Sequence, residues 1–266
     1  MNDTVLNLDS ALDPAIERAA LAFLTPAPAA KAPSLDFLPG ARHRRIDSPS
    51  GPLAAAEWGD GPAVLLLHGW EGKASDLAAF APPLLAAGRK VIALNLPAHG
   101  ESAGERTSIP TSARAIAAAQ QALGPLQAVV AHSVGTAVMV EAVALGLPVE
   151  RLALISAPAR YAMYAMGFAA QAGLSPAQTE AMLQALREMG VDVHSISTPR
   201  RAASLRQPVL FVHSADDRVV PIGDAELSRS KWAGPAELLR LDGLGHRRIL
   251  QAPEVVAAVT AFVTAS

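Results

Sequence analysis

Three side chains in the sequence could together cleave an ester or a related bond. Ser133 stands in AHSVG, Asp217 in HSADDRVVP and His246 in GLGHRR. A serine hydroxyl is a weak nucleophile near neutral pH, so it needs a base within hydrogen-bonding reach, and a carboxylate must orient that base. The three residues fit these roles, with Ser133 as the nucleophile, His246 as the base and Asp217 as the orienting acid.

The segment around Ser133 has the features of a nucleophile turn. AHSVG follows the apolar run LQAVV and precedes the helical pattern VGTAVMVEAVALG, so Ser133 lies where a strand passes into a helix. Such a turn strains the backbone and brings its neighbours against adjacent elements, which requires small residues two before and two after the serine. Ala131 and Gly135 meet this requirement. Taken alone, the pattern also fits an ordinary turn whose serine caps the helix.

The acid and the base each follow a predicted strand. Asp217 comes after PVLFVHS and His246 after AELLRLDG, and the order serine, aspartate, histidine is the one used by acyl hydrolases on an α/β sheet. Singly, each residue could be a helix cap or a packing residue. Their joint order and placement favour a catalytic site, with Asp216 and Asp242 as alternatives for the acid.

Acyl transfer also needs backbone donors for the developing oxyanion. HGW at 68–70 closes the strand AVLLL, and the amides of Trp70 and Val134 are the predicted pair, the second because it begins a helix. The Trp70 side chain would either line the substrate pocket or pack in the core. We expect His68 to be a structural hydrogen-bonding residue.

The elements that position these residues form a repeating pattern. From Gly61 onward, short apolar runs alternate with amphipathic segments, which is typical of strands buried on both faces of a parallel sheet. This predicts an α/β fold with a mostly parallel central sheet and helices on both faces. Right-handed crossovers place the carboxyl ends of such strands at one edge, where ligands bind. Before this pattern, RHRRID and PLAAAEWGD flank SPSG and predict a hairpin.

The chain divides into three predicted parts. Residues 1–40 form an N-terminal helix and a Pro/Ala linker, 41–158 and 207–266 form the core, and 159–206 form a small helical cap inserted into it. The cap has two helical stretches, RYAMYAMGFAAQAG and SPAQTEAMLQALREMG, the second beginning at the N-cap Ser175 and ending at Gly190. The N-terminal helix would pack on the body or on a second subunit.

The cap is expected to lie over Ser133 and to present an apolar surface to the substrate. The candidate pocket residues, besides Trp70, are Tyr161, Met163, Tyr164, Met166 and Phe168. Each of them could instead bury the cap against the sheet. Arg247 and Arg248 adjoin the base, and they either attract an anionic substrate or face solvent.

Composition excludes several classes of partner and site. The net charge is −2, so no strong field draws the chain to nucleic acid or to anionic lipid. Without cysteine there is no disulfide and no thiolate nucleophile. The acidic N-terminus lacks the pattern of a signal peptide, and no apolar run is long enough to span a membrane. We expect a cytoplasmic monomer or homodimer that uses no metal or cofactor.

At these residues the chain resembles the α/β-hydrolase superfamily over positions 43–266. The resemblance rests on HGW, LNLPAHGES, AHSVG, HSADDRVVP and GLGHRR. It implies the α/β-hydrolase fold, and alignment of D-x-x-V-P implies that Asp217 is the acid. Four positions depart from the usual motifs. Ala131 and Ser214 replace glycines, while Asn95 and Ala98 replace the Asp and Gly of D-L-P-G-H-G.

The chain looks like the small bacterial serine hydrolases and esterases whose substrates are mostly unassigned. The predicted activity is cleavage of a small to medium carboxylic ester through an acyl-enzyme on Ser133, as in a carboxylesterase. The same three residues would also serve an amidase, a thioesterase or a carbon-carbon bond hydrolase. A fold of this kind can also act as a catalytically silent binding module.

Overall fold

The computed structural model describes residues 13–265, and its centre is a mixed sheet of eight strands. The strand order across the sheet is β1-β2-β4-β3-β5-β6-β7-β8. The strands are β1 (Arg42–Ile46), β2 (Leu53–Trp58), β3 (Ala63–Leu67), β4 (Lys90–Leu94), β5 (Leu126–His132), β6 (Val149–Ile155), β7 (Val209–Ser214) and β8 (Ala236–Leu241). β3 to β8 run parallel to one another, which confirms the predicted α/β fold.

The predicted hairpin is confirmed as the pair β1 and β2, which run antiparallel. Two hydrogen bonds close its turn. The Gly51 amide donates to the Ser48 carbonyl at 3.0 Å, and the Ser48 hydroxyl donates to the Gly51 carbonyl at 2.7 Å. Gly51 has φ of +87°, a left-handed conformation that favours glycine. β2 also pairs antiparallel with β4 and so joins the hairpin to the parallel part of the sheet.

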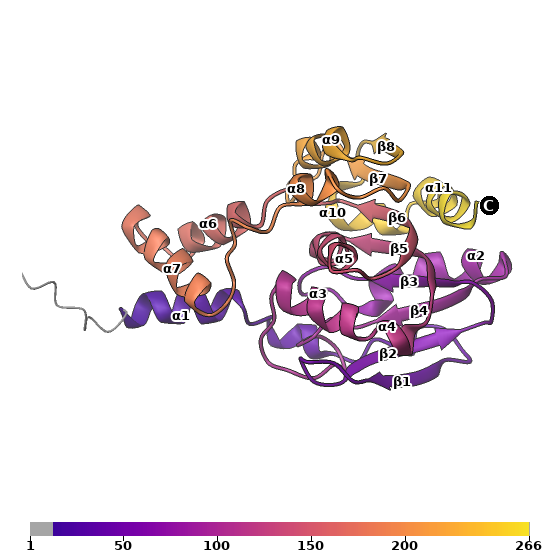
Figure 1. Ribbon diagram of the computed structural model, residues 1–266, viewed down its shortest axis with the longest axis horizontal. Coiled ribbons are helices and arrows are strands. Elements are labelled where there is room, and N and C mark those ends of the chain that lie inside the picture. Colours follow the sequence, from indigo (N-terminus) through magenta and orange to yellow (C-terminus); the bar gives the residue numbers. More distant parts are fainter. Residues whose placement is uncertain (1–12, 266) are drawn as a thin grey trace, which may run out of the picture.

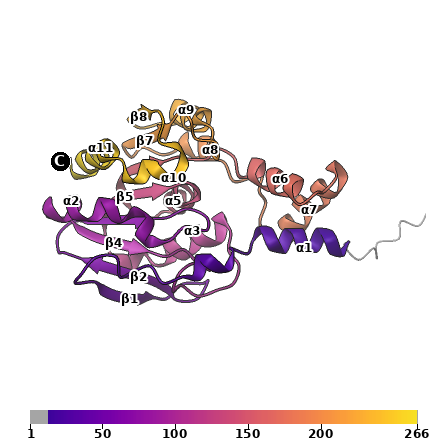
Figure 2. The same ribbon diagram turned by 180° about the vertical axis from the view of Figure 1, so that it is seen from behind.

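Helices cover both faces of the sheet (Figures 1 and 2). One face carries α3 (Ile109–Ala118), α4 (Gln120–Leu123), α5 (Val134–Ala144), α8 (Thr198–Ala202) and α9 (Ile222–Lys231). The other carries the 3-10 helices η2 (Ala74–Phe80) and η3 (Ile249–Gln251) with α2 (Ala81–Ala86), α10 (Gly245–Arg248) and α11 (Pro253–Thr264). Side chains of β3 alternate between the two cores, Leu65 and Leu67 toward the first and Val64 and Leu66 toward the second.

One predicted helix is divided. The pattern SDLAAFAPPLLAAG indicates a single helix after β3, whereas the structure has the 3-10 helix η2 followed by the short helix α2. Pro82 and Pro83 stand in the first turn of α2, where a missing amide hydrogen costs nothing. Inside a longer helix, the same two prolines would each remove a hydrogen bond.

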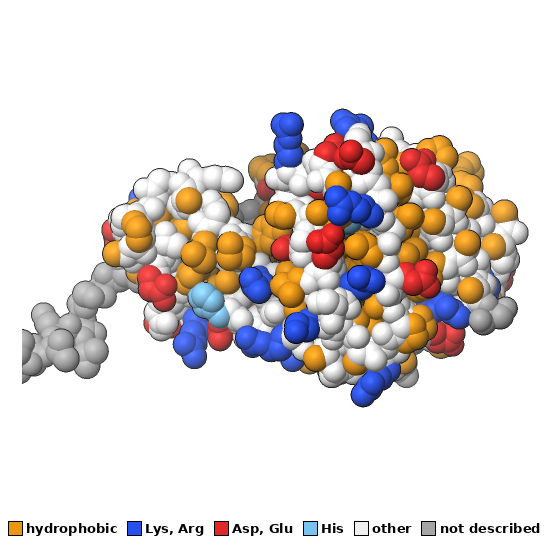
Figure 3. Space-filling view, turned by 90° about the horizontal axis from the view of Figure 1, so that it is seen from above, with side chains coloured by type: hydrophobic (Ala, Val, Ile, Leu, Met, Phe, Trp, Pro, Cys, Tyr) orange, Lys and Arg blue, Asp and Glu red, His pale blue; other side chains and the backbone are white. Residues whose placement is uncertain are grey.

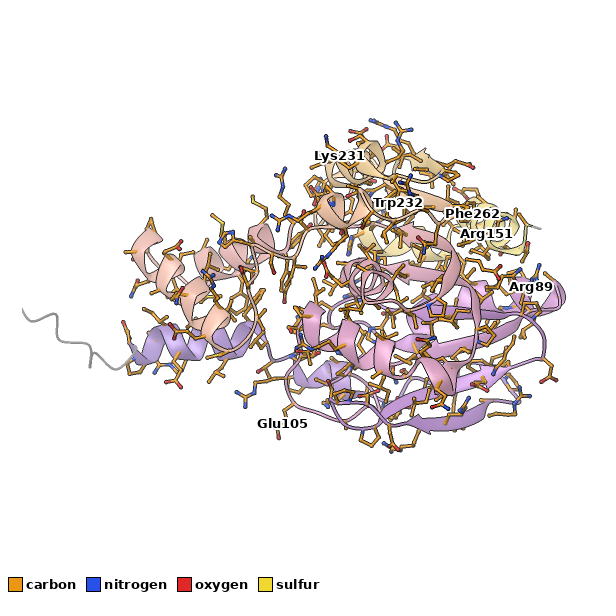
Figure 4. The ribbon with its side chains drawn as sticks, viewed as in Figure 1. Arg89, Glu105, Arg151, Lys231, Trp232 and Phe262 are labelled. Carbon is orange, nitrogen blue, oxygen red and sulfur yellow. The ribbon has the colours of Figure 1, made fainter. Side chains whose placement is uncertain are left out.

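Contacts with α11 fix the sheet near the amino ends of its strands, opposite the carboxyl ends that the sequence motifs follow. The Arg151 guanidinium at the start of β6 lies 5.9 Å from the centre of the Phe262 ring, and both side chains are labelled in Figure 4. Arg89 donates from Nη2 to the Thr264 carbonyl at 2.7 Å. These contacts anchor the C-terminal helix far from the candidate site.

Within residues 13–265, the lobe that we call the cap consists of α1 (Pro14–Phe23), α6 (Tyr161–Gln171) and α7 (Pro176–Glu188), which project beyond the edge of the sheet (Figure 1). The two predicted helices are confirmed as α6 and α7, with the Ser175 hydroxyl accepting from the Gln178 amide at 3.3 Å. The third is the predicted N-terminal helix, described from residue 13 as α1. Aromatic side chains pack α1 against α6. The ring centre of Phe23 lies 5.3 Å from that of Tyr161 and 5.4 Å from that of Phe168. The exact limits of the three parts of the chain stay a prediction.

The segment between α1 and β1, residues 24–38, crosses the core as a strap. The sequence predicted an extended linker here, whereas the structure has a 3-10 turn, η1 (Pro28–Lys31), and several bonds to the core. The Ala27 amide donates to Glu71 Oε1 at 2.9 Å, and the Ala30 carbonyl accepts from the Gly100 amide at 2.6 Å. Polar groups of the strap therefore hold it to the core, where a flexible linker would leave them to water.

No helix within residues 13–265 is long and apolar enough to cross a membrane.

Replacing Phe23 by alanine is expected to lower the free energy of unfolding by about 3 kcal/mol. The ring is nearly buried against two aromatic side chains of α6, and truncation leaves a cavity at this junction. Urea denaturation measures the change. Met166→Ala is the control, because this side chain is 44% exposed and its loss should cost less than about 0.5 kcal/mol. Equal stabilities of the two variants would contradict the packing of α1 on the cap.

Candidate active site

Ser133 occupies a sharp turn between β5 and α5. Its backbone has φ of 52° and ψ of −127°, a conformation that is strained for any residue with a side chain. A bond of 2.9 Å from the Ser133 amide to the Ile155 carbonyl fixes the turn to β6. Gly135 must be small, because a Cβ there would lie 2.3 Å from the His68 carbonyl oxygen. The geometry is that of the nucleophile turn predicted from AHSVG.

The three predicted catalytic residues lie in one hydrogen-bonded chain. His246 Nε2 is 3.0 Å from Ser133 Oγ, and His246 Nδ1 is 2.7 Å from Asp217 Oδ2. With the proton on Nδ1, the imidazole donates to the carboxylate and presents an acceptor to the hydroxyl. The arrangement can take the hydroxyl proton while an oxygen nucleophile attacks a carbonyl carbon.

Asp217, of the three candidate acids, is the one that contacts His246. Its other oxygen, Oδ1, accepts from the amides of Val219 at 2.8 Å and Val220 at 2.9 Å. Burial raises the pKa of the carboxyl, but the hydrogen bonds from His246 and these amides outweigh burial and lower the pKa to about 2. Asp217 therefore carries its charge at neutral pH and can stabilise an imidazolium.

The other two aspartates have different partners. Asp216 accepts from the Ser214 hydroxyl and, at 2.9 Å, from the Gly245 amide, so it supports the loop before His246 without touching the imidazole. Asp242 accepts from the Gly243 amide at 3.0 Å. Ser214 also accepts from the Leu244 amide at 3.1 Å. The serine that replaces a usual glycine thus helps to hold the histidine loop, a role that the motif comparison missed.

The two predicted oxyanion donors have no competing acceptor. In the part of the chain that the structure describes, neither the Trp70 nor the Val134 amide donates to a protein group. Val134 begins α5, so its amide has no acceptor within the helix. The chain at Gly69 passes so near that a Cβ there would lie 2.8 Å from the Cβ of Ser133. Both amides therefore lack a protein acceptor among the described residues, and their role as oxyanion donors stays a prediction.

Two buried histidines brace the loop that carries Trp70. His68 Nδ1 donates to the Gly69 carbonyl at 2.7 Å and its Nε2 accepts from the Leu96 amide at 3.1 Å. His99 Nε2 accepts from the Glu71 amide at 3.0 Å. Burial is the main cause that lowers the pKa of His68 to about 3, and the nearby His99 lowers it further; burial also lowers the pKa of His99. Neutral rings can both donate and accept, which lets them fix the backbone of this loop.

His132, which sequence reasoning did not single out, positions the loop of the base. Its Nε2 lies 2.9 Å from the His246 carbonyl oxygen, and the two ring centres are 4.7 Å apart. Burial, followed by the charge of His246, lowers the pKa of His132 to about 3, so the ring is neutral and donates this bond. The sequence signal that could have identified His132 is its position directly before Ser133 in AHSVG.

A crevice of about 230 Å³ opens beside Ser133. Its lining residues are Gly69, Trp70, Gly72, Asp76, His132, Ser133, His246, Arg247, Leu250 and Gln251. Only Trp70 and Leu250 bring large apolar side chains, so most of the lining is polar or small. Trp70 thus lines the crevice while its ring packs against His99, with ring centres 5.5 Å apart.

The cap side chains predicted for the pocket do not reach this crevice. Tyr161 and Tyr164 line a second, very small cavity with Val134, the residue after Ser133. Tyr164 also donates from its hydroxyl to Asp224 at 3.3 Å. Phe168 packs against Phe23 of α1.

The surface of the cap carries many apolar side chains. In the space-filling view the cap is a lobe set off from the core, with apolar side chains on its outside (Figure 3). Met163 and Met166 are both exposed. The cap extends away from the sheet edge because α1, α6 and α7 bury their apolar faces on one another, which the local pattern of each helix did not show.

Comparison with known proteins identifies the family of this chain. A family described as the alpha/beta hydrolase family matches residues 64–259. The chain belongs to the alpha/beta hydrolase family. The fold is therefore the α/β-hydrolase fold, and the protein is a carboxylesterase-like hydrolase, as the sequence predicted.

One curated relative of this hydrolase is an esterase. The chain is 29% identical over 253 residues to a pimeloyl-(acyl-carrier protein) methyl ester esterase of Xanthomonas campestris pv. campestris (strain B100). The match covers 78% of this chain and 97% of the relative.

Solved structures share the fold of this hydrolase at low sequence identity. An esterase from Rhodococcus sp. ECU1013 superposes with a TM-score of 0.63 at 21% identity, over 84% of this chain and 98% of the other. A thioesterase domain from the curacin biosynthetic pathway gives a TM-score of 0.62 at 18% identity. The match covers 85% of this chain and 100% of the other.

The stability of this hydrolase is expected to fall as the pH falls below about 6.5. An unfolded histidine binds a proton near this pH, whereas His68 and His132 in the folded chain do so only near a pKa of about 3. Between these two values the unfolded state holds more protons, so each histidine lowers the free energy of unfolding by about 1.4 kcal/mol per pH unit.

Urea denaturation at pH 7 and at pH 5 measures this dependence. His132→Asn keeps a donor for the His246 carbonyl but cannot take up a proton, so its stability should fall less between the two pH values than that of the wild type. An unchanged pH dependence in this variant would count against a buried neutral His132.

Proposed function

We propose that this hydrolase cleaves a carboxylic ester through an acyl-enzyme intermediate on Ser133. The observation that carries the proposal is the continuous chain from Ser133 Oγ through both nitrogens of His246 to Asp217, at 3.0 Å and 2.7 Å. Family membership supports ester hydrolysis as the reaction class.

The first half-reaction forms the acyl-enzyme. His246 Nε2 takes the proton of Ser133 as Oγ attacks the ester carbonyl, and Asp217 stabilises the imidazolium that results. The amides of Trp70 and Val134 hold the negative charge that develops on the carbonyl oxygen. His246 then gives its proton to the departing alkoxide. In the second half-reaction His246 activates a water molecule, which releases the acid from Ser133.

The surroundings of Ser133 favour a short acyl group. Val134, which follows the nucleophile, lines a cavity of only about 10 Å³ together with Tyr161 and Tyr164 of the cap. A space of this size holds about one water molecule. We propose that the acyl group points toward Val134 and that only a short group is accepted, because the cap residues leave almost no free space on this side.

A panel of p-nitrophenyl acetate, butyrate and octanoate, with the matching anilides and thioesters, tests the proposal. We expect the esters to be cleaved fastest, the acetate first among them. Faster cleavage of the anilides or thioesters would change the bond assignment to an amidase or a thioesterase. Ligand binding that survives Ser133→Ala, with no hydrolysis of any compound, would favour a silent binding module.

A further inference from the structure

Two side chains that line the crevice beside Ser133, Arg247 and Asp76, carry opposite charges. Arg247 lies on the wall formed by α10, next to His246, and Asp76 lies on the wall formed by η2. They form no ion pair with each other. A charged side chain in a substrate crevice is free to select the charge of the substrate.

Arg247 differs from its neighbour Arg248 in having its guanidinium available. Arg248 donates from Nη2 to the Gly243 carbonyl at 2.8 Å. Within residues 13–265, Arg247 forms no ion pair and no side-chain hydrogen bond, while its side chain lines the crevice. The charge of Arg247 also acts on His132, which lines the same crevice. Burial and His246 are the larger causes that lower the pKa of His132, and Arg247 lowers it further.

The Asp76 side chain is already engaged. Its Oδ2 accepts from the Lys73 amide at 3.0 Å, in the capping box of η2. The carboxylate still carries a negative charge that faces the crevice. An anionic group would therefore bind at the Arg247 wall, away from Asp76.

The catalytic geometry decides which part of an ester meets Arg247. His246 must protonate the departing alkoxide, so the alcohol portion lies against His246, while the acyl oxygen lies at the amides of Trp70 and Val134. Arg247 follows His246 in the chain and shares its wall of the crevice.

We propose that the crevice selects esters whose alcohol portion carries a carboxylate or a similar anionic group, and that Arg247 is the residue that binds this group. This proposal rests on the proposed esterase activity and names its substrate class. A guanidinium recognises carboxylate and phosphate oxygens through charged hydrogen bonds, which are stronger than neutral ones.

Paired substrates test the proposal. p-Acetoxybenzoate has an anionic alcohol portion, and its methyl ester is the neutral counterpart with the same acetyl group. In Arg247→Gln we expect kcat/KM for p-acetoxybenzoate to fall about tenfold or more relative to the methyl ester. Asp76→Asn should shift the same ratio in the opposite direction, because it removes a repulsive charge. Added salt should weaken the preference of the wild type.

Arg248→Gln is the matched control, since it removes the same charge one residue away and should leave the substrate ratio unchanged. If this ratio fell equally in both arginine variants, the proposal would be overturned, because the effect would then come from the overall positive charge near the site and not from binding by Arg247. The mono-p-nitrophenyl ester of glutaric acid places the carboxylate in the acyl portion. A loss seen only with this compound would also overturn the proposal.

A binding measurement separates this proposal from the esterase assignment. p-Hydroxybenzoate, the alcohol product, should raise the melting temperature of the wild type and of Ser133→Ala, but not that of Arg247→Gln. Failure of the wild type to hydrolyse either ester, with this shift still present, would reject the esterase and keep the anion site. Ester turnover without any charge preference and without the shift would reject the anion site alone.

Discussion

Replacing Ser133 by alanine is expected to lower kcat/KM for p-nitrophenyl acetate by about 10⁴-fold or more. The variant loses the hydroxyl oxygen that lies 3.0 Å from His246 Nε2, while the amides of Trp70 and Val134 remain. Residual turnover of the kind that binding and oxyanion stabilisation alone provide should persist. Steady-state kinetics with wild type and variant at equal concentration measures the loss.

Ser156 provides a matched control for this change. It follows β6 at the same edge of the sheet, it is buried, and its φ of 52° equals that of Ser133. Its hydroxyl has no hydrogen-bond partner among the described residues. Ser156→Ala removes a hydroxyl from a residue with the same φ and should change kcat/KM by less than about twofold. Similar losses in the two variants would mean that the effect comes from the fold and not from nucleophilic attack.

Replacing Asp217 by asparagine is expected to lower kcat by about 10⁴-fold with little change in KM. The asparagine carbonyl can still accept from the Val219 and Val220 amides, which turns its NH₂ group toward His246 Nδ1. A donor at that position places the imidazole proton on Nε2. In this tautomer His246 donates to Ser133 and cannot take its proton.

Asp216→Asn is the companion variant. Asp216 bonds to the Ser214 hydroxyl and the Gly245 amide, and an asparagine oxygen can keep the amide bond. We expect a loss of less than about tenfold, because only the support of the histidine loop is weakened. If Asp216→Asn lost more activity than Asp217→Asn, the acid would be Asp216.

The arrangement of the candidate site could be predicted from the sequence because its signals are local. A buried parallel strand has to be continuously apolar, and a nucleophile turn requires small neighbours. Neighbouring residues in the sequence are therefore enough to predict β5 and the turn at Ser133. Parallel strands with right-handed crossovers then bring their carboxyl ends to one edge, which places Asp217 and His246 beside Ser133.

The supporting contacts could not be predicted in this way, because they join residues far apart in the chain. His132 bonds to the carbonyl of His246, and the strap residue Ala27 bonds to Glu71, which follows Trp70 in the chain. Ser214 differs from the usual glycine, and only the structure shows that its hydroxyl meets the histidine loop.

The placement of the cap depended on long-range packing as well. Each cap helix is evident from its own pattern, but the direction of the cap depends on the packing of α1, from the start of the chain, against α6 and α7. An apolar stripe predicts that a helix is buried and does not identify its partner. The aromatic side chains predicted for the pocket therefore divide between the packing of the cap and a small cavity beside Val134.

Mass spectrometry after treatment with a fluorophosphonate tests the central claim most directly, because this reagent forms a stable adduct with an activated serine. We expect one adduct per chain, on the tryptic peptide that contains Ser133. Labelling should be lost in Ser133→Ala and retained in Ser156→Ala. An adduct on another residue, or undiminished labelling of Ser133→Ala, would contradict nucleophilic catalysis by Ser133.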